Sequence, residues 1–216
     1  RNNMLIQLAS LFTAILSLLA VNGDPISVKT NIQSPLISSQ QPQLSAQSAF
    51  LIDTTTGRIL LEKNADTVRP IASIAKLMTA LVVLDYLKDS PSSEGLSFNT
   101  PITFESEDQR NGGIDYLIPG ETIMLTDAWR LMLIGSSNDA TALLARVAGN
   151  TEEKFVKAMN EKTKQLGLAH TIFADPTGLD SGNISTARET AALARAALAI
   201  PKIRDAVQTR KFSFEK

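Results

Sequence analysis

The segment at residues 71–84 constrains the fold more than any other part of this chain. It carries a single charge, Lys76, among thirteen uncharged and mostly apolar residues. A helix that is apolar nearly all round has no face suited to water. We therefore expect a buried central helix that ends near Lys88, where the Ser- and Pro-containing residues 89–95 break the pattern.

Ser73 and Lys76 lie three residues apart in this segment, so they share one face of the expected helix. Burial disfavours the charged form of a lysine and lowers its pKa. A neutral lysine beside a serine can take the hydroxyl proton, so the pair has the chemistry of a nucleophile with its own base. The alternative is a buried helix start with an unrelated serine and a lysine whose head group reaches water.

The composition fits one globular domain, with 44% hydrophobic and 20% charged residues among 216. A formal net charge of −1 without a long basic run gives no electrostatic basis for nucleic-acid binding. Cysteine is absent, which excludes thiol chemistry, and His170 is the only histidine. A zinc cluster is therefore not expected, and a Ser-His-Asp triad would depend on that one residue. No cofactor is predicted.

Three parts follow one another along the chain. Residues 1–23 hold an apolar stretch of intermediate length, which predicts a signal peptide or an N-terminal membrane anchor. Residues 24–47 are rich in Ser, Gln and Pro and predict a linker. Residues 48–216 predict the folded domain.

The domain pattern combines short β-rich runs with longer helical ones. Residues 48–64 predict a β-hairpin around the turn at 54–57. Helices are expected from Thr126 as N-cap, over residues 139–148, from 151 to 166 and from 186 to 200, with a short helix after that. Residues 209–216 alternate like a strand.

A second candidate group is Ser136-Ser137-Asn138, between two expected helices. A turn at such a position can present a hydroxyl and an amide to a cleft. The alternative is a capping loop in which these side chains satisfy free backbone groups. The pairing with Ser73 and Lys76 favours the functional interpretation, because penicillin-interacting serine enzymes combine Ser-x-x-Lys with a Ser-x-Asn type element.

With these elements, the chain resembles the serine-type D-alanyl-D-alanine carboxypeptidases, the low-molecular-mass penicillin-binding proteins. The resemblance covers residue 48 to the last residue and rests on six segments in the family's order: 49–64, 70–80, 119–121, 136–140, 175–179 and 210–214. It implies an α+β fold of the β-lactamase and transpeptidase type, with a helical cluster packed on an antiparallel sheet. It also implies an exported enzyme, in the bacterial periplasm or on the outer face of the cytoplasmic membrane to which its N-terminal segment would tether it.

The resemblance further implies roles for four residues. Ser73 would attack a peptidoglycan pentapeptide that ends in D-Ala-D-Ala and form an acyl-enzyme, with Lys76 as the base. Ser136 would relay a proton to the departing D-alanine, and Asn138 would orient the substrate amide and hold Lys76. β-Lactams are expected to acylate the same serine as covalent inhibitors.

One motif of the resembled family does not occur in the sequence. Lys-Thr-Gly or Lys-Ser-Gly, on a later strand of the sheet, should follow residues 212–214. That strand lines the oxyanion hole in the family, and losing one oxyanion donor costs about 100- to 1000-fold in turnover. We therefore expect a C-terminally truncated, partial catalytic domain with later sheet strands missing, inactive on its own.

Two other functions compete with this interpretation. A class A β-lactamase shares Ser-x-x-Lys, but its glutamate-bearing loop has no counterpart at residues 175–180. A membrane-tethered peptidoglycan-binding module without catalysis would have the same segments and lack the third motif. Labelling of Ser73 by penicillin separates either enzyme from such a module.

Several further residues are interpreted as structural. Glu105, Glu107 and Asp108 form an acidic loop that we expect to be a solvated turn rather than a metal site. Asp139 is expected to cap a helix, and Gly178 to supply a backbone conformation beside the active-site loop. His170 is assigned no chemistry.

Overall fold

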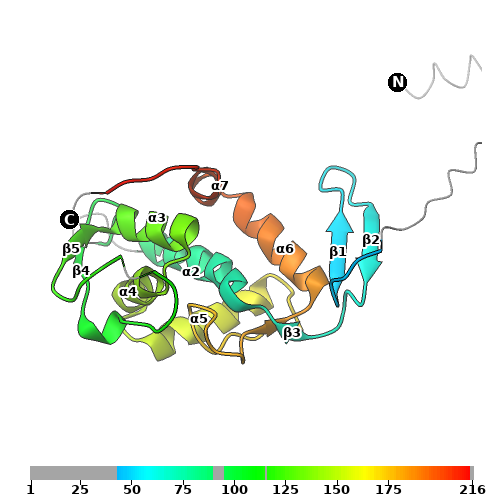
Figure 1. Cartoon of the computed structure of the whole chain (residues 1–216), viewed down its shortest axis with the longest axis horizontal. Helices are drawn as coiled ribbons and strands as arrows, with labels where there is room; N and C mark the ends of the chain where they lie inside the picture. The colour runs from blue at the N-terminus through cyan, green and yellow to red at the C-terminus, as the bar shows by residue number, and fades with distance from the viewer. Residues whose placement is uncertain (1–42, 90–94, 115, 215–216) are drawn as a thin grey trace, which may run out of the picture. The chain divides into compact units, whose positions relative to one another are not determined.

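A computed structural model describes residues 43–89, 95–114 and 116–214, which lie within one compact unit, Pro42–Lys216. The elements in chain order are β1 (Ala49–Ile52), β2 (Ile59–Lys63), β3 (Arg69–Pro70), the 3-10 turn η1 (Ala72–Ile74), α2 (Ala75–Asp89), β4 (Pro101–Thr103), the 3-10 turn η2 (Ser106–Asp108), β5 (Thr122–Met124), α3 (Leu125–Gly135), α4 (Asn138–Gly149), α5 (Glu152–Gln165), β6 (Ile184–Ser185), α6 (Ala187–Leu198) and α7 (Pro201–Val207). Helices clustered with small antiparallel sheets confirm the expected α+β class (Figure 1).

Helix α2 is the central element and contacts α3, α4, α5 and α6 (Figure 1). Its side chains Met78, Ala80 and Val83 are fully buried. Truncating a buried methionine such as Met78 to alanine typically costs about 2–5 kcal/mol, so packing of this kind holds the cluster together. The predicted buried central helix is confirmed, and it ends one residue beyond Lys88.

Side-chain caps fix the starts of three helices. Ser137 Oγ accepts from Ala140 N at the start of α4, and Thr151 Oγ1 accepts from Lys154 N at the start of α5. Thr186 Oγ1 does the same for Glu189 N in α6. Each such bond is worth about 1 kcal/mol, and together they set where the helices around α2 begin.

Two expected caps are wrong. Strand β5 runs directly into α3, so that helix begins at Leu125, and Thr126 lies inside its first turn. Asp139 does not cap α4, because Ser137 already does. The Asp139 carboxylate instead accepts a hydrogen bond from Arg110 N at 2.8 Å, which ties α4 to the preceding loop.

The strand pairs bring distant segments together. The predicted hairpin is confirmed as β1 and β2, and β4 pairs with β5. Strand β3 pairs with β6 in the register Arg69 to Ser185 and Pro70 to Ile184. This pairing places the segment just before Ser73 next to the segment that follows residues 175–183. The β3 and β6 pair therefore anchors both sides of the candidate site.

The strand expected at residues 209–216 is absent from 209–214, the described part of that range. A strand needs a hydrogen-bonded neighbour, and no described segment pairs with these residues. Their alternation has another effect, since Phe212 and Phe214 stack with ring centroids 5.7 Å apart, and Arg130 lies over Phe212.

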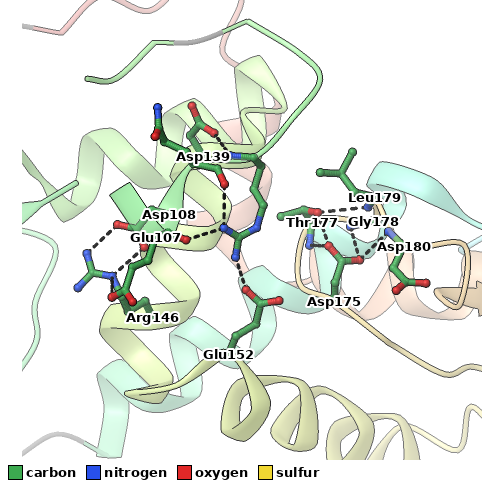
Figure 2. Close-up of polar contacts among 12 residues, drawn as sticks. Glu107, Asp108, Asp139, Arg146, Glu152, Asp175, Thr177, Gly178, Leu179 and Asp180 are labelled. Carbon is green, nitrogen blue, oxygen red and sulfur yellow. Dashed lines mark hydrogen bonds and ion pairs between the residues drawn. The ribbon is translucent and has the colours of Figure 1, made fainter. Parts of the chain in front are cut away.

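The expectation of a solvated turn for the acidic loop holds for Glu105 and Glu107, which are exposed, but is wrong for Asp108. Asp108 is 1% exposed, and both of its carboxylate oxygens accept from Arg146, each at 2.7 Å (Figure 2). Arg146 also donates to the Thr103 carbonyl at 2.8 Å. This bidentate pair joins η2 to α4, and the hydrogen bonds that Arg146 donates to Asp108 raise the pKa of the Arg146 guanidinium further above its usual range.

An Arg146→Met variant is expected to lose about 3–5 kcal/mol of unfolding free energy, because it leaves the buried Asp108 carboxylate unpaired. Lys157→Met is the matched control, since Lys157 is exposed and its ion pair with Glu161 spans 4.0 Å. That control should cost about 0.5 kcal/mol or less. Denaturant titration measures both, and equal losses would show that the Asp108 pair is no more than a surface contact.

The N-terminal predictions lie almost entirely outside the described residues. The expected signal peptide or anchor at residues 1–23 is outside them, as is the linker at 24–47 except for its last five residues. Among the helices of the described part, none combines the length and apolarity needed to cross a bilayer.

Candidate active site

Ser73 lies in η1, one turn before Lys76, which is the second residue of α2. The chain enters this turn through Ala72 with φ +47°, a backbone conformation that costs a non-glycine residue free energy and that is enriched at functional sites. The turn leaves Ser73 exposed while Lys76 is only 3% exposed. The predicted pair is brought together, with Lys76 Nζ at 3.0 Å from Ser73 Oγ.

The Lys76 side chain is held by three acceptors from three parts of the chain. They are Ser73 Oγ at 3.0 Å, Asn138 Oδ1 at 2.8 Å and the Thr177 carbonyl at 2.8 Å. An ammonium has three N–H donors, so this set satisfies the protonated form completely. In the neutral form the nitrogen keeps a lone pair, which can accept the Ser73 proton at the same contact.

Burial and a nearby negative charge have opposite effects on the pKa of Lys76. Burial lowers its pKa from 10.5 to about 8, and the negative charge of Asp175 opposes part of this fall. At pH 7 about a tenth of such lysines are neutral, compared with well under a thousandth for an unperturbed lysine. A lysine with this pKa is therefore partly neutral, and able to accept a proton, near neutral pH.

Asn138, the first residue of α4, contributes both ends of its amide. Its Oδ1 accepts from Lys76, and its Nδ2 donates to the Gly112 carbonyl at 2.7 Å. The second bond fixes the amide so that its oxygen faces the lysine. Because an amide NH₂ carries two hydrogens, one donor of Asn138 remains for another acceptor.

Ser136 is only partly placed as expected. It is the C-cap of α3, exposed, with a left-handed backbone at φ +52°. Within the described residues its hydroxyl has no hydrogen-bond partner, so the structure brings Ser73, Lys76 and Asn138 into one network but not Ser136. The buried serine of the motif is Ser137, which caps α4.

The loop at residues 175–180 forms the third wall of the site. Gly178 has φ +88°, and a Cβ there would lie 2.0 Å from the Ala72 carbonyl oxygen and 2.8 Å from Ser73 N. The expectation that Gly178 supplies a backbone conformation beside the site is therefore confirmed. The role of Thr177 was not predicted, since it acts through its backbone carbonyl, and a carbonyl leaves no signature in residue type.

Two other expectations concern His170 and metal binding. His170 is exposed, and its Nδ1 lies 2.9 Å from Glu189 Oε1. In the part of the chain that the structure describes, no group of three His, Asp or Glu side chains is arranged to hold a metal ion.

Comparison with known protein families identifies one that covers most of the chain. A family model described as D-alanyl-D-alanine carboxypeptidase matches residues 36–215. Curated relatives include the D-alanyl-D-alanine endopeptidases of Pseudomonas aeruginosa, 38% identical over 87% of this chain and 56% of the relative, and of Escherichia coli, 37% identical over 94% and 62%. The carboxypeptidase DacF of Bacillus subtilis is 35% identical over 69% of this chain and 38% of the relative. The chain thus spans between 38% and 62% of the length of these three curated relatives.

Solved structures give the same result. The D-alanyl-D-alanine carboxypeptidase DacD of Francisella tularensis superposes with a TM-score of 0.69 at 30% identity, covering 87% of this chain and 43% of that one. A mutant of the Streptomyces K15 DD-transpeptidase superposes with a TM-score of 0.70 at 27% identity, covering 79% of this chain and 67% of that one. Both similarities agree with the transpeptidase-like fold that the sequence implied.

Proposed function

Since this chain belongs to the D-alanyl-D-alanine carboxypeptidase family, we propose that the protein is a serine peptidase that cleaves D-Ala-D-Ala stem peptides of peptidoglycan through an acyl-enzyme on Ser73. The observation that supports this most is the contact between Ser73 Oγ and Lys76 Nζ at 3.0 Å, with the lysine buried and its pKa lowered to about 8. A hydroxyl becomes a nucleophile when a base at hydrogen-bond distance can accept its proton.

The proposed reaction has two steps that balance in protons. Ser73 Oγ bonds to the carbonyl carbon of the penultimate D-alanine while its proton passes to Lys76 Nζ. The peptide C–N bond then breaks, and the proton passes from Lys76 Nζ through the Ser136 hydroxyl to the departing amine. Water next adds to the ester, the bond from carbon to Oγ breaks, and Ser73 regains its proton.

Two features of the site assist the first step. Ser73 lies at the N-terminal end of the continuous η1 and α2 segment, where the helix dipole favours the negative charge that develops on the carbonyl oxygen. The remaining donor of Asn138 is available for a carbonyl of the peptide, which would orient the substrate along the cleft. The expectation that these 216 residues alone are inactive stays a prediction.

The leaving group distinguishes two forms of this activity. A carboxypeptidase releases free D-alanine, whereas an endopeptidase cuts the link between two joined peptides. Of the three curated relatives named above, two are named endopeptidases and one a carboxypeptidase. The chemistry at Ser73 is the same for both.

Product analysis of the complete protein tests this proposal. Incubated with a free pentapeptide and with a cross-linked dimer, it is expected to cleave at least one of them, with release of D-alanine or of monomers. Failure on both, together with no labelling by a fluorescent penicillin, would instead support the non-catalytic binding module. Rapid turnover of penicillin without peptide cleavage would support the β-lactamase.

The pH dependence of acylation is a further prediction. The rate of penicillin acylation is expected to rise with pH along a limb centred near pH 8, because only the neutral Lys76 can take the Ser73 proton. Rates measured from about pH 6 to about pH 10 test this. A limb centred above about pH 10 would mean that burial does not lower the lysine pKa.

We also propose that the protein is exported and that its N-terminal segment tethers it to the cytoplasmic membrane, or is removed by cleavage, with the catalytic domain on the outer side. The apolar stretch within residues 1–23 supports this, as does a peptidoglycan substrate, which lies outside that membrane. Protease accessibility in intact spheroplasts tests it, with digestion of the domain as the expected result and protection as the contrary one.

A further inference from the structure

The loop at residues 175–180 contacts both reacting residues. The Thr177 carbonyl accepts from Lys76 Nζ at 2.8 Å, and Gly178 packs against the backbone between Ala72 and Ser73. One residue earlier, the Pro176 carbonyl accepts from Thr79 Oγ1 at 2.6 Å, one turn further along α2. The position of this loop therefore determines the distance between the nucleophile and its base.

The loop is organised around one carboxylate, that of Asp175 (Figure 2). Asp175 Oδ2 accepts from Thr177 N at 3.0 Å and from Thr177 Oγ1, while Oδ1 accepts from Gly178 N at 3.1 Å and Asp180 N at 3.2 Å. Oδ1 also accepts from the Asn183 amide. Five donors on one half-buried side chain fix the backbone of every residue through which the loop reaches the active site.

The Asp175 carboxylate is charged. Burial by itself would raise its pKa, but the hydrogen bonds, led by those from Thr177, outweigh it and hold the pKa below the ordinary value. No Lys, Arg or His nitrogen in the described part of the chain forms an ion pair with it within 4 Å. Its charge therefore acts on Lys76 without being neutralised by a closer cation.

Other charged groups on the elements packed around α2 are bound elsewhere. Asp139 of α4 accepts from Arg110 N. Other charged side chains on these elements form ion pairs: Asp127 with Arg130 on α3, Arg146 of α4 with Asp108, Lys162 of α5 with Asp85 of α2, Arg188 of α6 with Asp66, and Glu189 of α6 with His170. Asp175 is the charge that bears most on Lys76.

We propose that Asp175 is a positioning residue of this active site, which holds the Thr177 carbonyl on Lys76 and the Gly178 backbone against Ser73. The proposal rests on the proposed function, since it concerns the same acylation. Asp175 has a second effect through its charge, which stabilises the protonated form of Lys76. It thereby sets the pH at which the lysine becomes a base, and it does so without touching the substrate.

An Asp175→Asn variant of the complete protein tests both effects. An amide cannot accept at both ends, so the loop loosens, and the plateau rate of penicillin acylation is expected to fall about 10- to 100-fold. Loss of the negative charge lowers the pKa of Lys76 further, so the acid limb is expected to shift to lower pH. The proposal would be overturned by a variant that is folded by circular dichroism, acylates at the wild-type plateau rate and has its acid limb at the wild-type pH.

Three companion variants separate charge from geometry. Asp175→Glu keeps the charge but misplaces the carboxylate oxygens. Its plateau rate of acylation should therefore fall, while its acid limb should stay at the wild-type pH. It also decides the case if Asp175→Asn does not fold, because a wild-type rate for Asp175→Glu would contradict positioning. Thr177→Val removes one hydroxyl donor, with the same expected pattern. Asp205→Asn removes an exposed charge on α7, outside the loop and outside the active-site network, and should match the wild type.

The wild-type protein is measured first, which separates this inference from the proposed function. No acylation of the wild type would refute the function itself. A different result would refute the charge effect alone. In that case the wild type acylates normally, and Asp175→Asn lowers the acylation rate but leaves the acid limb at the wild-type pH.

Discussion

Replacing Ser73 with alanine is expected to abolish both penicillin labelling and cleavage of D-Ala-D-Ala peptides. The Ser73 hydroxyl is the atom that Lys76 can deprotonate at 3.0 Å. Removing an activated nucleophile lowers turnover by roughly 10⁴-fold or more in serine hydrolases. Because Ser73 is exposed, the unfolding free energy should change by about 1 kcal/mol or less, so the loss will not reflect unfolding.

Ser181→Ala serves as the matched control, since Ser181 is an exposed serine in a loop beyond the site. It should retain wild-type labelling and turnover. A Ser73→Ala protein that still forms a stable penicillin adduct would show that the nucleophile is elsewhere.

Replacing Gly178 with alanine is expected to destabilise the fold strongly and to disrupt the site as well. The new Cβ would lie 2.0 Å from the Ala72 carbonyl oxygen and 2.3 Å from its carbon, distances that only backbone movement can relieve. The positive φ adds about 1 kcal/mol of strain. Together these predict a loss of roughly 3–5 kcal/mol and displacement of Ser73 from Lys76.

Gly120→Ala isolates the clash from the backbone strain. Gly120 has φ +93°, close to that of Gly178, but a Cβ there meets no atom within 4 Å. This control should cost only about 1 kcal/mol and leave acylation unchanged. Denaturant unfolding and penicillin labelling measure both variants, and equal effects at the two positions would contradict the close approach at Ser73.

The central helix and the contact between Ser73 and Lys76 could be predicted from the sequence because both depend on local spacing. An apolar run with a single lysine can only be buried, and a serine three residues earlier lies on the same face of the helix. Asn138 was reachable through its motif, although its partner Lys76 is 62 residues away. Caps such as Thr151 and Thr186 were also predictable, because capping is a property of the residue and its nearest neighbours.

What could not be predicted depends on contacts between residues that are far apart in the sequence. The Thr177 carbonyl binds Lys76 across 101 residues, and any residue type could have supplied it. The burial of Asp108 gives no local signal, because its partner, Arg146, is 38 residues further along the chain. The strained φ of Ala72 likewise follows from the approach of Gly178 and has no local signal.

The account depends on a covalent bond to Ser73, and mass spectrometry of the penicillin-treated protein tests that bond directly. The intact protein is expected to gain the mass of one penicillin molecule, and digestion should place the adduct on the peptide that contains Ser73. An adduct on another residue, such as Ser136, or a protein that gains no mass at all would contradict the account.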